Sequence, residues 1–359
     1  MKKRFYDPRP GAERAALSER PPPACELHRA GEYRPSPGLI DAANVAILLG
    51  QPLLLTGEPG TGKTRFAHAL ADNLNLHPVH ECFVKSSTSA KDLFYSFDEL
   101  ARFRDSHAGV ARPLQCYLGF NGMGRAILFA GGPDHPLTML PGLAFEDDAP
   151  ARARPRVFGD LYPASAFPEA PVTSIVLIDE LDKAPRDTPN DMLNEIERLG
   201  FDIPELGVRV EVPSEPKTRP LTVITSNSEK SLPEPFLRRC IYFDIPFPID
   251  DLRSIVLAQA KWLAQGGLLL DEALSLFKLL RDRTRVQRAP GTAELLAWMD
   301  TLAHEGLLPK HSLRTALQKS IAAPTELPLL ESTFAVLVKK TEDRSAASDI
   351  VRAWIDAPP

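Results

Sequence analysis

Continuous apolar runs recur along the first two thirds of the chain and predict buried strands. They are found at 52–56 (PLLLT), 174–178 (SIVLI), 221–225 (LTVIT) and 241–245 (IYFDI). Runs of this length without polar alternation suit strands that are covered on both faces of a parallel sheet. The pattern therefore favours an α/β core with several parallel strands.

Helical periodicity separates these runs. Apolar residues recur at helical spacing at positions 39, 40, 43, 47 and 48, and a second helix is expected from 65 onward, directly after a glycine-rich loop. Strand, glycine loop and helix in this order open a doubly wound parallel sheet. We therefore expect a nucleotide-binding αβα core over residues 36–248.

The pattern changes at both ends of this core and once inside it. Residues 1–35 are rich in Pro and Arg and indicate an extended arm, whereas 249–359 contain only amphipathic helical segments, the first of which Asp250 could cap. The proline-dense stretch 131–171 has no steady period and predicts an irregular surface insertion. Such an insertion is either functional or a tolerated addition without a role.

Composition narrows the class of protein. The chain has 359 residues, and its 42 basic and 47 acidic residues give a net charge of −5, which argues against general attraction to nucleic acid. Cys25, Cys82, Cys116 and Cys240 are far apart and suggest neither a zinc site nor a disulfide scaffold. No apolar stretch approaches the ~20 residues of a membrane span, and no secretory signal is recognisable. We expect a cytoplasmic protein without membrane insertion.

The strongest chemical signal is the sequence GEPGTGKT at 57–64, which matches the phosphate-loop pattern GxxxxGK[ST] between a strand and a helix. Its glycines let backbone N–H groups surround phosphate oxygens at the positive end of a helix. Lys63 would reach the β- and γ-phosphates, and Thr64 would offer its hydroxyl to Mg²⁺. The residues expected to bind ATP are Gly57, Glu58, Pro59, Gly60, Thr61, Gly62, Lys63, Thr64 and Arg65.

Polar residues at the ends of later strands complete a candidate hydrolytic site. Asp179 and Glu180 follow the second apolar run, so that Asp179 could hold Mg²⁺ and Glu180 could activate the attacking water. Asn227 follows the third run and could orient that water, although a turn asparagine is the plain alternative. Arg238 and Arg239 precede the fourth run. They are either a solvated pair, or one of them enters a neighbouring subunit's site as an arginine finger.

Together these motifs resemble the AAA+ ATPases, and within them the MoxR-like branch, over residues 36–300. The resemblance rests on GEPGTGKT at 57–64, IDELDKA at 178–184, ITSN at 224–227 and the arginine pair. It implies an αβα domain with a helical lid, ATP and Mg²⁺ as cofactors, and a ring, commonly a hexamer, in which the arginine is supplied in trans. It also implies a chaperone-like remodeler, often paired with a protein that carries a von Willebrand A domain.

The chain departs from the MoxR-like pattern in its lid. Gly291 stands where that branch carries its sensor-2 arginine, and Arg285 or Arg288 could substitute. The number of residues between Lys63 and Asp179 is also large for the family, and the stretch 131–171 accounts for much of the extra length.

Two other functions remain open from the sequence. One is a nucleotide-gated assembly module that hydrolyses slowly, which the altered lid favours and the intact acidic pair opposes. The other is a nucleic-acid-stimulated motor like the ATPase subunits of some restriction systems, which the net charge opposes.

Two further patterns have plain explanations. His77 and His80 do not match a metal motif because Pro78 interrupts the helix that such a motif requires. The aromatics Phe94, Tyr95, Phe97 and Phe103 are either a substrate-gripping loop or ordinary core residues, of which the second is favoured.

Overall fold

A computed structural model describes residues 33–76, 78–141, 155–212, 218–227, 232–263, 266–282, 288–322 and 333–357. The predicted extended arm therefore lies almost entirely outside the described residues, as do Arg285, His77 and part of the 131–171 stretch. The chain divides into two compact units, which are described separately. One comprises 35–57 and 63–245, and the other comprises 1–34, 58–62 and 246–359.

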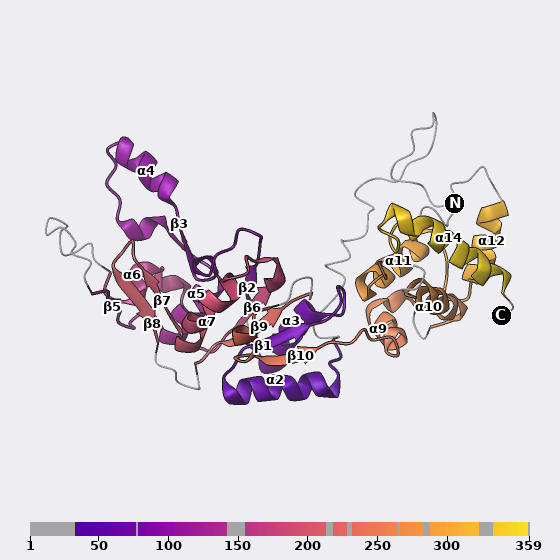
Figure 1. Ribbon diagram of the computed structural model, residues 1–359, viewed down its shortest axis with the longest axis horizontal. Helices are drawn as coiled ribbons and strands as arrows, with labels where there is room; N and C mark the ends of the chain where they lie inside the picture. Colours follow the sequence, from indigo (N-terminus) through magenta and orange to yellow (C-terminus); the bar gives the residue numbers. More distant parts are fainter. Residues whose placement is uncertain are drawn as a thin grey trace. The chain divides into compact units, whose positions relative to one another are not determined.

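The first unit, which we call the core unit, is built on a five-stranded parallel sheet in the order β10-β1-β9-β6-β2 (Figure 1). The strands are β1 (Leu53–Thr56), β2 (His80–Phe83), β6 (Ile175–Asp179), β9 (Leu221–Thr225) and β10 (Ile241–Asp244). The predicted α/β P-loop fold with a parallel sheet is confirmed. Four of these strands coincide with the four apolar runs, whereas β2 was not predicted.

Helices pack along this sheet. They are α2 (Pro37–Leu49) against β10 and β1, α3 (Lys63–Leu74) against β6 and β9, and α5 (Gly122–Gly131) against β2 and β6. The α5 helix approaches β2 very closely, since a Cβ atom on Gly122 would lie 2.6 Å from Cys82 Sγ. Helix α7 (Thr188–Arg198) follows β6 and buries Met192, Leu193 and Ile196 in the same core.

Two small antiparallel sheets extend the core unit. One pairs β3 (Tyr95–Phe97) with β4 (Leu118–Phe120), with α4 (Glu99–His107) between them in sequence. The other joins β5 (Thr138–Met139), β8 (Val208–Glu211) and β7 (Gly200–Ile203). Helix α6 (Phe158–Leu161), inside the 131–171 stretch, packs fully buried Phe158 into the core.

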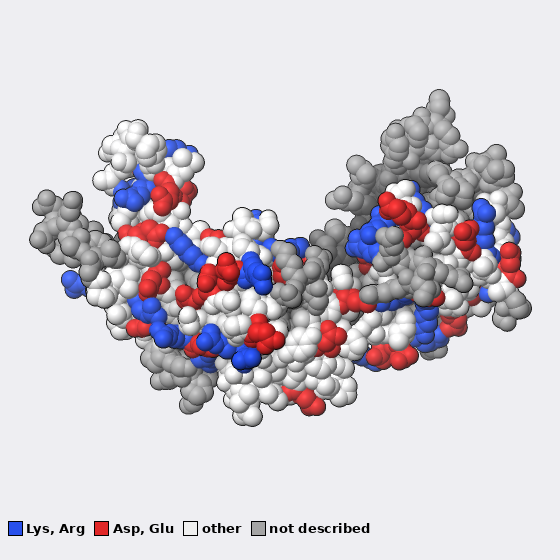
Figure 2. Space-filling model, viewed as in Figure 1, with Lys and Arg blue, Asp and Glu red and all other residues white. Residues whose placement is uncertain are grey.

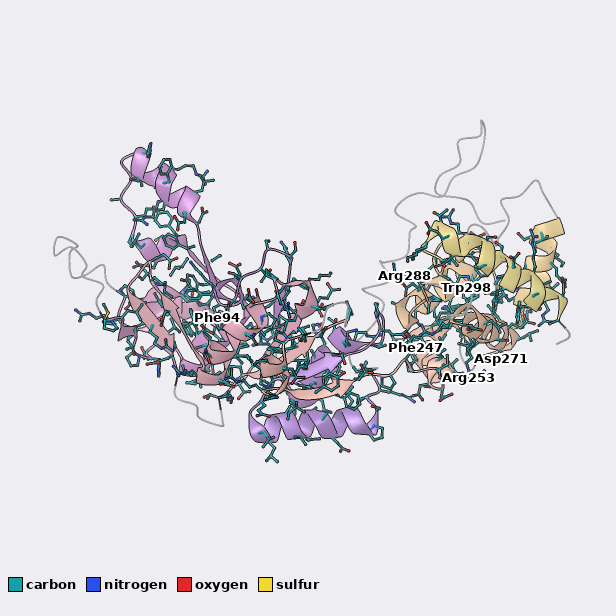
Figure 3. All side chains as sticks on the ribbon, in the orientation of Figure 1. Phe94, Phe247, Arg253, Asp271, Arg288 and Trp298 are labelled. Atoms are coloured by element: carbon teal, nitrogen blue, oxygen red, sulfur yellow. The ribbon has the colours of Figure 1, made fainter. Side chains whose placement is uncertain are left out.

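The aromatic residues around β3 divide into two kinds. Phe94 and Tyr95 are each 1% exposed and contact Phe201 at ring-centroid distances of 5.1 and 5.8 Å, so they are core residues, as favoured (Figure 3). Phe103 on α4 is 58% exposed and does not belong to the core. No residue of α4 is buried.

The second unit has a helical core of its own. Its helices are α9 (Leu252–Gln259), α10 (Leu268–Leu280), α11 (Thr292–His304), α12 (Leu313–Ala322) and α14 (Thr341–Asp356). They enclose an apolar cluster that includes the fully buried Trp298 (Figure 3). Asp251, not Asp250, precedes α9, and its side chain makes no capping hydrogen bond. In the described parts of both units, no helix has the length and apolarity that crossing a bilayer requires.

Candidate active site

The sheet order brings the candidate catalytic residues of the core unit to one edge. Strand β9 lies between β1 and β6, and all three run parallel. Their carboxyl ends carry Gly57, Thr225 and Asp179, respectively. Ligands of open parallel sheets bind outside the carboxyl ends of the strands. The order of strands thus explains why motifs separated by more than a hundred residues meet at one place.

The phosphate loop has the backbone conformation that its glycines allow. Gly57, Gly60 and Gly62 all have positive φ, at 137°, 83° and 94°. A side chain at any of them would strain the backbone. Thr61 donates from its hydroxyl to the carbonyl oxygen of Glu58 at 2.9 Å, which closes the turn. Helix α3 then begins at Lys63, so its unpaired N–H groups and positive dipole end lie at the loop.

Lys63 is buried at this edge, with 6% of its surface exposed, and its Nζ donates to the carbonyl oxygen of Gly57 at 2.8 Å. Burial lowers the pKa of Lys63, and the nearby carboxylates of Asp182, Asp179, Glu180 and Asp244 act in the opposite direction. The charged groups with the largest influence on this ammonium are therefore all acidic. A phosphate would supply an acceptor in place of the backbone carbonyl.

Thr64 and Asp179 form the candidate metal site. Thr64 Oγ1 lies 2.9 Å from Asp179 Oδ1, and Thr225 Oγ1 donates to the same oxygen at 2.6 Å. Thr225 is 1% exposed and also accepts a hydrogen bond from the backbone N–H of Glu180 at 2.9 Å. A hydroxyl and a carboxylate side by side are the hard oxygen donors that Mg²⁺ takes beside a phosphate. These residues therefore fit the ion that the motifs imply.

Glu180 is held in a strained conformation next to this pair. Its φ and ψ are 59° and 50°, in the left-handed region that is costly for a residue with a side chain. Asn227 Nδ2 donates to Glu180 Oε1 at 3.2 Å, and Lys183 Nζ is paired with Glu180 Oε2. Asn227 is itself fixed by its backbone N–H, which donates to Asp182 Oδ1 at 3.1 Å. The structure thus brings together Asn227 and Glu180, the two residues proposed to handle water.

The arginine pair lies elsewhere on the core unit. Arg238 and Arg239 lie just before Cys240 and β10, at the amino end of a strand whose carboxyl end adjoins the nucleotide edge. The side chain of Arg238 is 80% exposed and lies 3.6 Å from Glu234, whereas Arg239 lies 3.4 Å from Glu197. The role of either arginine in a neighbouring subunit's site stays a prediction.

The helical unit also carries an arginine that the sequence did not single out. Arg281, 10% exposed, donates from Nη2 to Glu58 Oε2 at 2.7 Å, and both residues belong to that unit. Its guanidinium lies over the ring of Phe247. Arg288 instead has its Nη2 3.9 Å from Glu294 Oε1, and the described residues do not include Arg285. No local motif marks Arg281, because its partner is more than two hundred positions away.

His80, considered and set aside as a metal ligand, is buried in β2 with 2% exposure. Its ring meets Phe129 edge-on at 5.4 Å. Burial, with a smaller contribution from Arg125, lowers the pKa of His80 to about 4. Within the described ranges, no group of three or more His, Cys, Asp or Glu could hold a metal ion. His80 is thus a neutral core residue at physiological pH.

Comparison with known proteins gives a family for part of the chain. Residues 52–120, which contain the phosphate loop, match the AAA domain family of the dynein-related subfamily. Among solved structures, the crystal structure of the FIGL-1 AAA domain in complex with ADP is similar at 15% sequence identity, covering 89% of this chain and 82% of that one, with a TM-score of 0.38. No curated protein sequence matches the chain. Residues 52–120 thus match an AAA domain of the dynein-related subfamily, in a chain whose core unit has an α/β fold with a parallel sheet.

Proposed function

We propose that this chain is an ATPase that hydrolyses Mg²⁺-bound ATP and uses the cycle to remodel a protein partner. The observation that carries the proposal is the arrangement at the carboxyl ends of β1, β9 and β6. There, Lys63, the Thr64–Asp179 pair and the Asn227–Glu180 pair converge on one edge of the sheet. AAA domains bind and hydrolyse ATP in general, and residues suited to hold phosphate, Mg²⁺ and the attacking water lie together at this edge.

In this proposal each residue of the site has one role. The backbone of the phosphate loop and Lys63 bind the phosphates, and Arg65 follows Thr64 in the first turn of α3. Thr64 and Asp179 would hold Mg²⁺, which neutralises phosphate charge when bound. Glu180 accepts a proton from the attacking water, and Asn227 orients that water. Positioning and electrostatic stabilisation account for most of the catalysis of phosphoryl transfer, which suits this preassembled set.

The finer parts of the proposal concern assembly and partner. We assign the chain to the MoxR-like branch on its motifs, and we propose a ring, with six subunits as the commonest number, in which Arg238 or Arg239 stabilises charge on the γ-phosphate of the neighbouring subunit. Support comes from the strong exposure of Arg238 and from the acidic surroundings of Lys63. A protein substrate, or a partner that carries a von Willebrand A domain, is the expected target.

The experiment compares ATP binding and hydrolysis by wild type and by Glu180→Gln, because glutamine has nearly the same shape as glutamate. We expect Glu180→Gln to keep ATP affinity and to lose about 10²–10⁴-fold in hydrolysis, the usual contribution of a general base. Lys63→Ala should impair binding itself. Glu99→Gln, an exposed glutamate on α4, is the matched control and should hydrolyse at the wild-type rate. If Glu180→Gln hydrolysed ATP normally, the assignment of the base would be wrong.

One observation favours a second candidate, a nucleotide-gated assembly module with slow hydrolysis. Both carboxylate oxygens of Glu180 are engaged, one by Asn227 and the other by Lys183. A base held in this way would have to release a partner before it accepts a proton. Turnover slower than the exchange of subunits between assemblies would support the module, and turnover faster than exchange would support the remodeler.

A further inference from the structure

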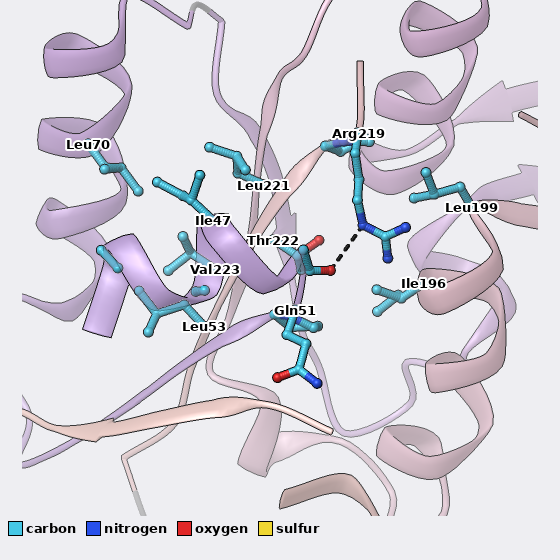
Figure 4. A pocket seen from close by; sticks show the side chains of 15 residues that line it. Ile47, Gln51, Leu53, Leu70, Ile196, Leu199, Arg219, Leu221, Thr222 and Val223 are labelled. Atoms are coloured by element: carbon cyan, nitrogen blue, oxygen red, sulfur yellow. Dashed lines mark hydrogen bonds between the residues drawn. The ribbon is translucent and has the colours of Figure 1, made fainter. Parts of the chain in front are cut away.

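Two cavities of the core unit differ greatly in size. The one between α2, α7 and the central sheet is about 20 Å³, no more than a water molecule needs (Figure 4). The other lies between the start of β3, α7 and the β7–β8 hairpin and is about 300 Å³, at the lower end of the range for ligand-binding pockets. We call it the β7 cavity. None of the residues proposed to bind ATP or Mg²⁺ lines it.

The apolar lining of the β7 cavity is largely fixed. Phe94, Tyr95 and Phe201 are at most 3% exposed and contact one another, so they form a rigid base. Ala90 and Pro204 complete the apolar lining and are more exposed. The cavity therefore offers apolar contact to a side chain that enters it.

Most charged side chains around the cavity already have partners. Lys91 Nζ lies 4.7 Å from the centre of the Tyr95 ring and 2.6 Å from Glu205 Oε1, so one ammonium is already held by an aromatic ring and a carboxylate. Arg209 is likewise paired with two carboxylates, at 2.6 and 2.8 Å. On the face of the molecule that Figure 2 shows, acidic and basic side chains of the core unit are intermixed in the same way.

Glu195 on α7 lines the cavity without such a partner. Its carboxylate makes no hydrogen bond or ion pair with any described residue, and its Oε2 is shielded from solvent. A shielded acceptor without a donor is costly, so this group favours a ligand that supplies one. Arg198, one turn further along α7, has no partner among the described residues either, but it is exposed and solvated. The shielding therefore selects Glu195 as the group that a ligand satisfies, and that ligand is a cation.

The β7 cavity lies beside the edge of a sheet. Within the described residues, β7 is the last strand of the β5–β8–β7 sheet, and its residues Phe201 and Asp202 line the cavity. An edge strand can pair through its main chain with an extended peptide, whose alternate side chains then point to one face. A peptide paired with β7 would thus place one side chain in the cavity.

We propose that the β7 cavity binds a lysine or arginine side chain of the protein substrate, presented by an extended segment that pairs with the edge of β7. The ammonium or guanidinium pairs with Glu195, and the aliphatic stem lies along the apolar lining. Lys91 and Arg209 do not oppose the incoming cation, because each is neutralised by its own carboxylates. The inference rests on the proposed function, since it names the substrate of the remodeler as an extended segment with basic residues.

Short fluorescein-labelled peptides that differ only in one central residue test this site. That residue is lysine, arginine, methionine or glutamate, and binding to the full-length protein is measured by fluorescence anisotropy with Mg²⁺-ATP present. The lysine and arginine peptides should bind about 10–100-fold more tightly than the methionine peptide, as one charge-assisted contact provides. Glu195→Gln should abolish this preference and leave the affinity for the methionine peptide unchanged, which separates a lost contact from a damaged fold. Glu99→Gln, which removes an exposed carboxylate on α4, is the matched control and should keep the preference.

A lysine preference that survives in Glu195→Gln, or equal binding of the lysine and methionine peptides to wild type, would overturn the site. An N-methylated lysine peptide lacks the main-chain donors for pairing with β7 and should bind more weakly; equal binding would overturn the strand pairing. Glu195-dependent binding of spermidine as tight as that of the lysine peptide would identify a free polyamine as the ligand and overturn the assignment to a peptide.

ATP hydrolysis measured on the same samples keeps this inference distinct from the proposed function. Absence of a lysine preference in a wild type that hydrolyses ATP overturns the β7 cavity alone. A Glu195-dependent lysine preference in a wild type that does not hydrolyse ATP overturns the proposed ATPase and supports the cavity as a peptide site.

Discussion

Thr225→Val is the substitution whose effect the structure defines most closely. Thr225 Oγ1 donates to Asp179 Oδ1 at 2.6 Å and accepts from the backbone N–H of Glu180 at 2.9 Å. One hydroxyl therefore positions both acidic residues of the site from the neighbouring strand. Valine has almost the same shape and lacks the hydroxyl, so the substitution removes the two hydrogen bonds without opening a cavity.

The expected magnitude follows from these two bonds. A buried N–H without an acceptor costs about 1–3 kcal/mol, and a lost hydrogen bond to a carboxylate costs about 1.5–3 kcal/mol. Asp179 keeps its hydrogen bond with the hydroxyl of Thr64 and is partly exposed. The cost of the lost hydrogen bond to its carboxylate therefore lies at the low end of that range. We expect the free energy of unfolding to fall by about 2–4 kcal/mol. Because Glu180 and Asp179 lose their common anchor, hydrolysis should fall about 10–100-fold, as small displacements of catalytic groups do.

The assay measures ATP hydrolysis against Mg²⁺ concentration, at a temperature where each variant is folded. Thr225→Val should need more Mg²⁺ for half-maximal rate, whereas a purely structural role would alter stability alone. Thr225→Ser, which keeps the hydroxyl, is the control and should have the wild-type Mg²⁺ dependence. Identical rates and Mg²⁺ dependence in the valine and serine variants would refute the positioning role.

Two further predictions concern the stability of the core unit. Tyr95→Phe removes the buried hydroxyl that donates to Glu205 Oε2 at 2.8 Å, and should lower the free energy of unfolding in urea by about 1–2 kcal/mol without changing nucleotide affinity. The pKa of His80 is about 4 in the folded protein and 6.5 in the unfolded chain. Between pH 6.5 and pH 4 the unfolded chain therefore binds a proton that the folded protein does not. The free energy of unfolding consequently falls as the pH drops through this range. The free energy of unfolding should be lower by up to about 3 kcal/mol at pH 4, and His80→Phe should abolish this pH dependence. If the free energy of unfolding of His80→Phe depended on pH as that of wild type does, His80 would not be the source.

Local sequence patterns marked more residues of the candidate site than elements of the surrounding fold. The phosphate loop, Asp179 and Glu180 are marked by local patterns at the ends of apolar runs, and the strand–loop–helix order needs no knowledge of distant contacts. Thr225 was not recognised, because its role depends on β9 lying between β1 and β6. Arg281 was missed for the same reason, since its contact with Glu58 is long-range.

The remaining elements depend on pairings that a one-dimensional pattern does not contain. Strand β2 has only four residues, of which the first two, His80 and Glu81, are polar, so it contains no continuous apolar run that would predict a strand. Strand β3 pairs with β4 across the intervening α4, and β5 pairs with the distant β8, whereas β7 and β8 are joined only by residues 204–207. For α2, periodicity predicted the helix but not its buried side, because an apolar residue stands at almost every position around it.

The central claim, a hydrolytic site completed by a neighbouring copy, is tested most directly by ATP hydrolysis against protein concentration. The comparison is wild type alone against an equimolar mixture with Arg238→Ala/Arg239→Ala. The account predicts that specific activity rises with concentration and that the variant lowers activity below simple dilution, because mixed assemblies contain sites without an arginine. Specific activity that is constant with concentration, together with simple dilution in the mixture, would mean self-contained sites and would contradict the shared site and the ring.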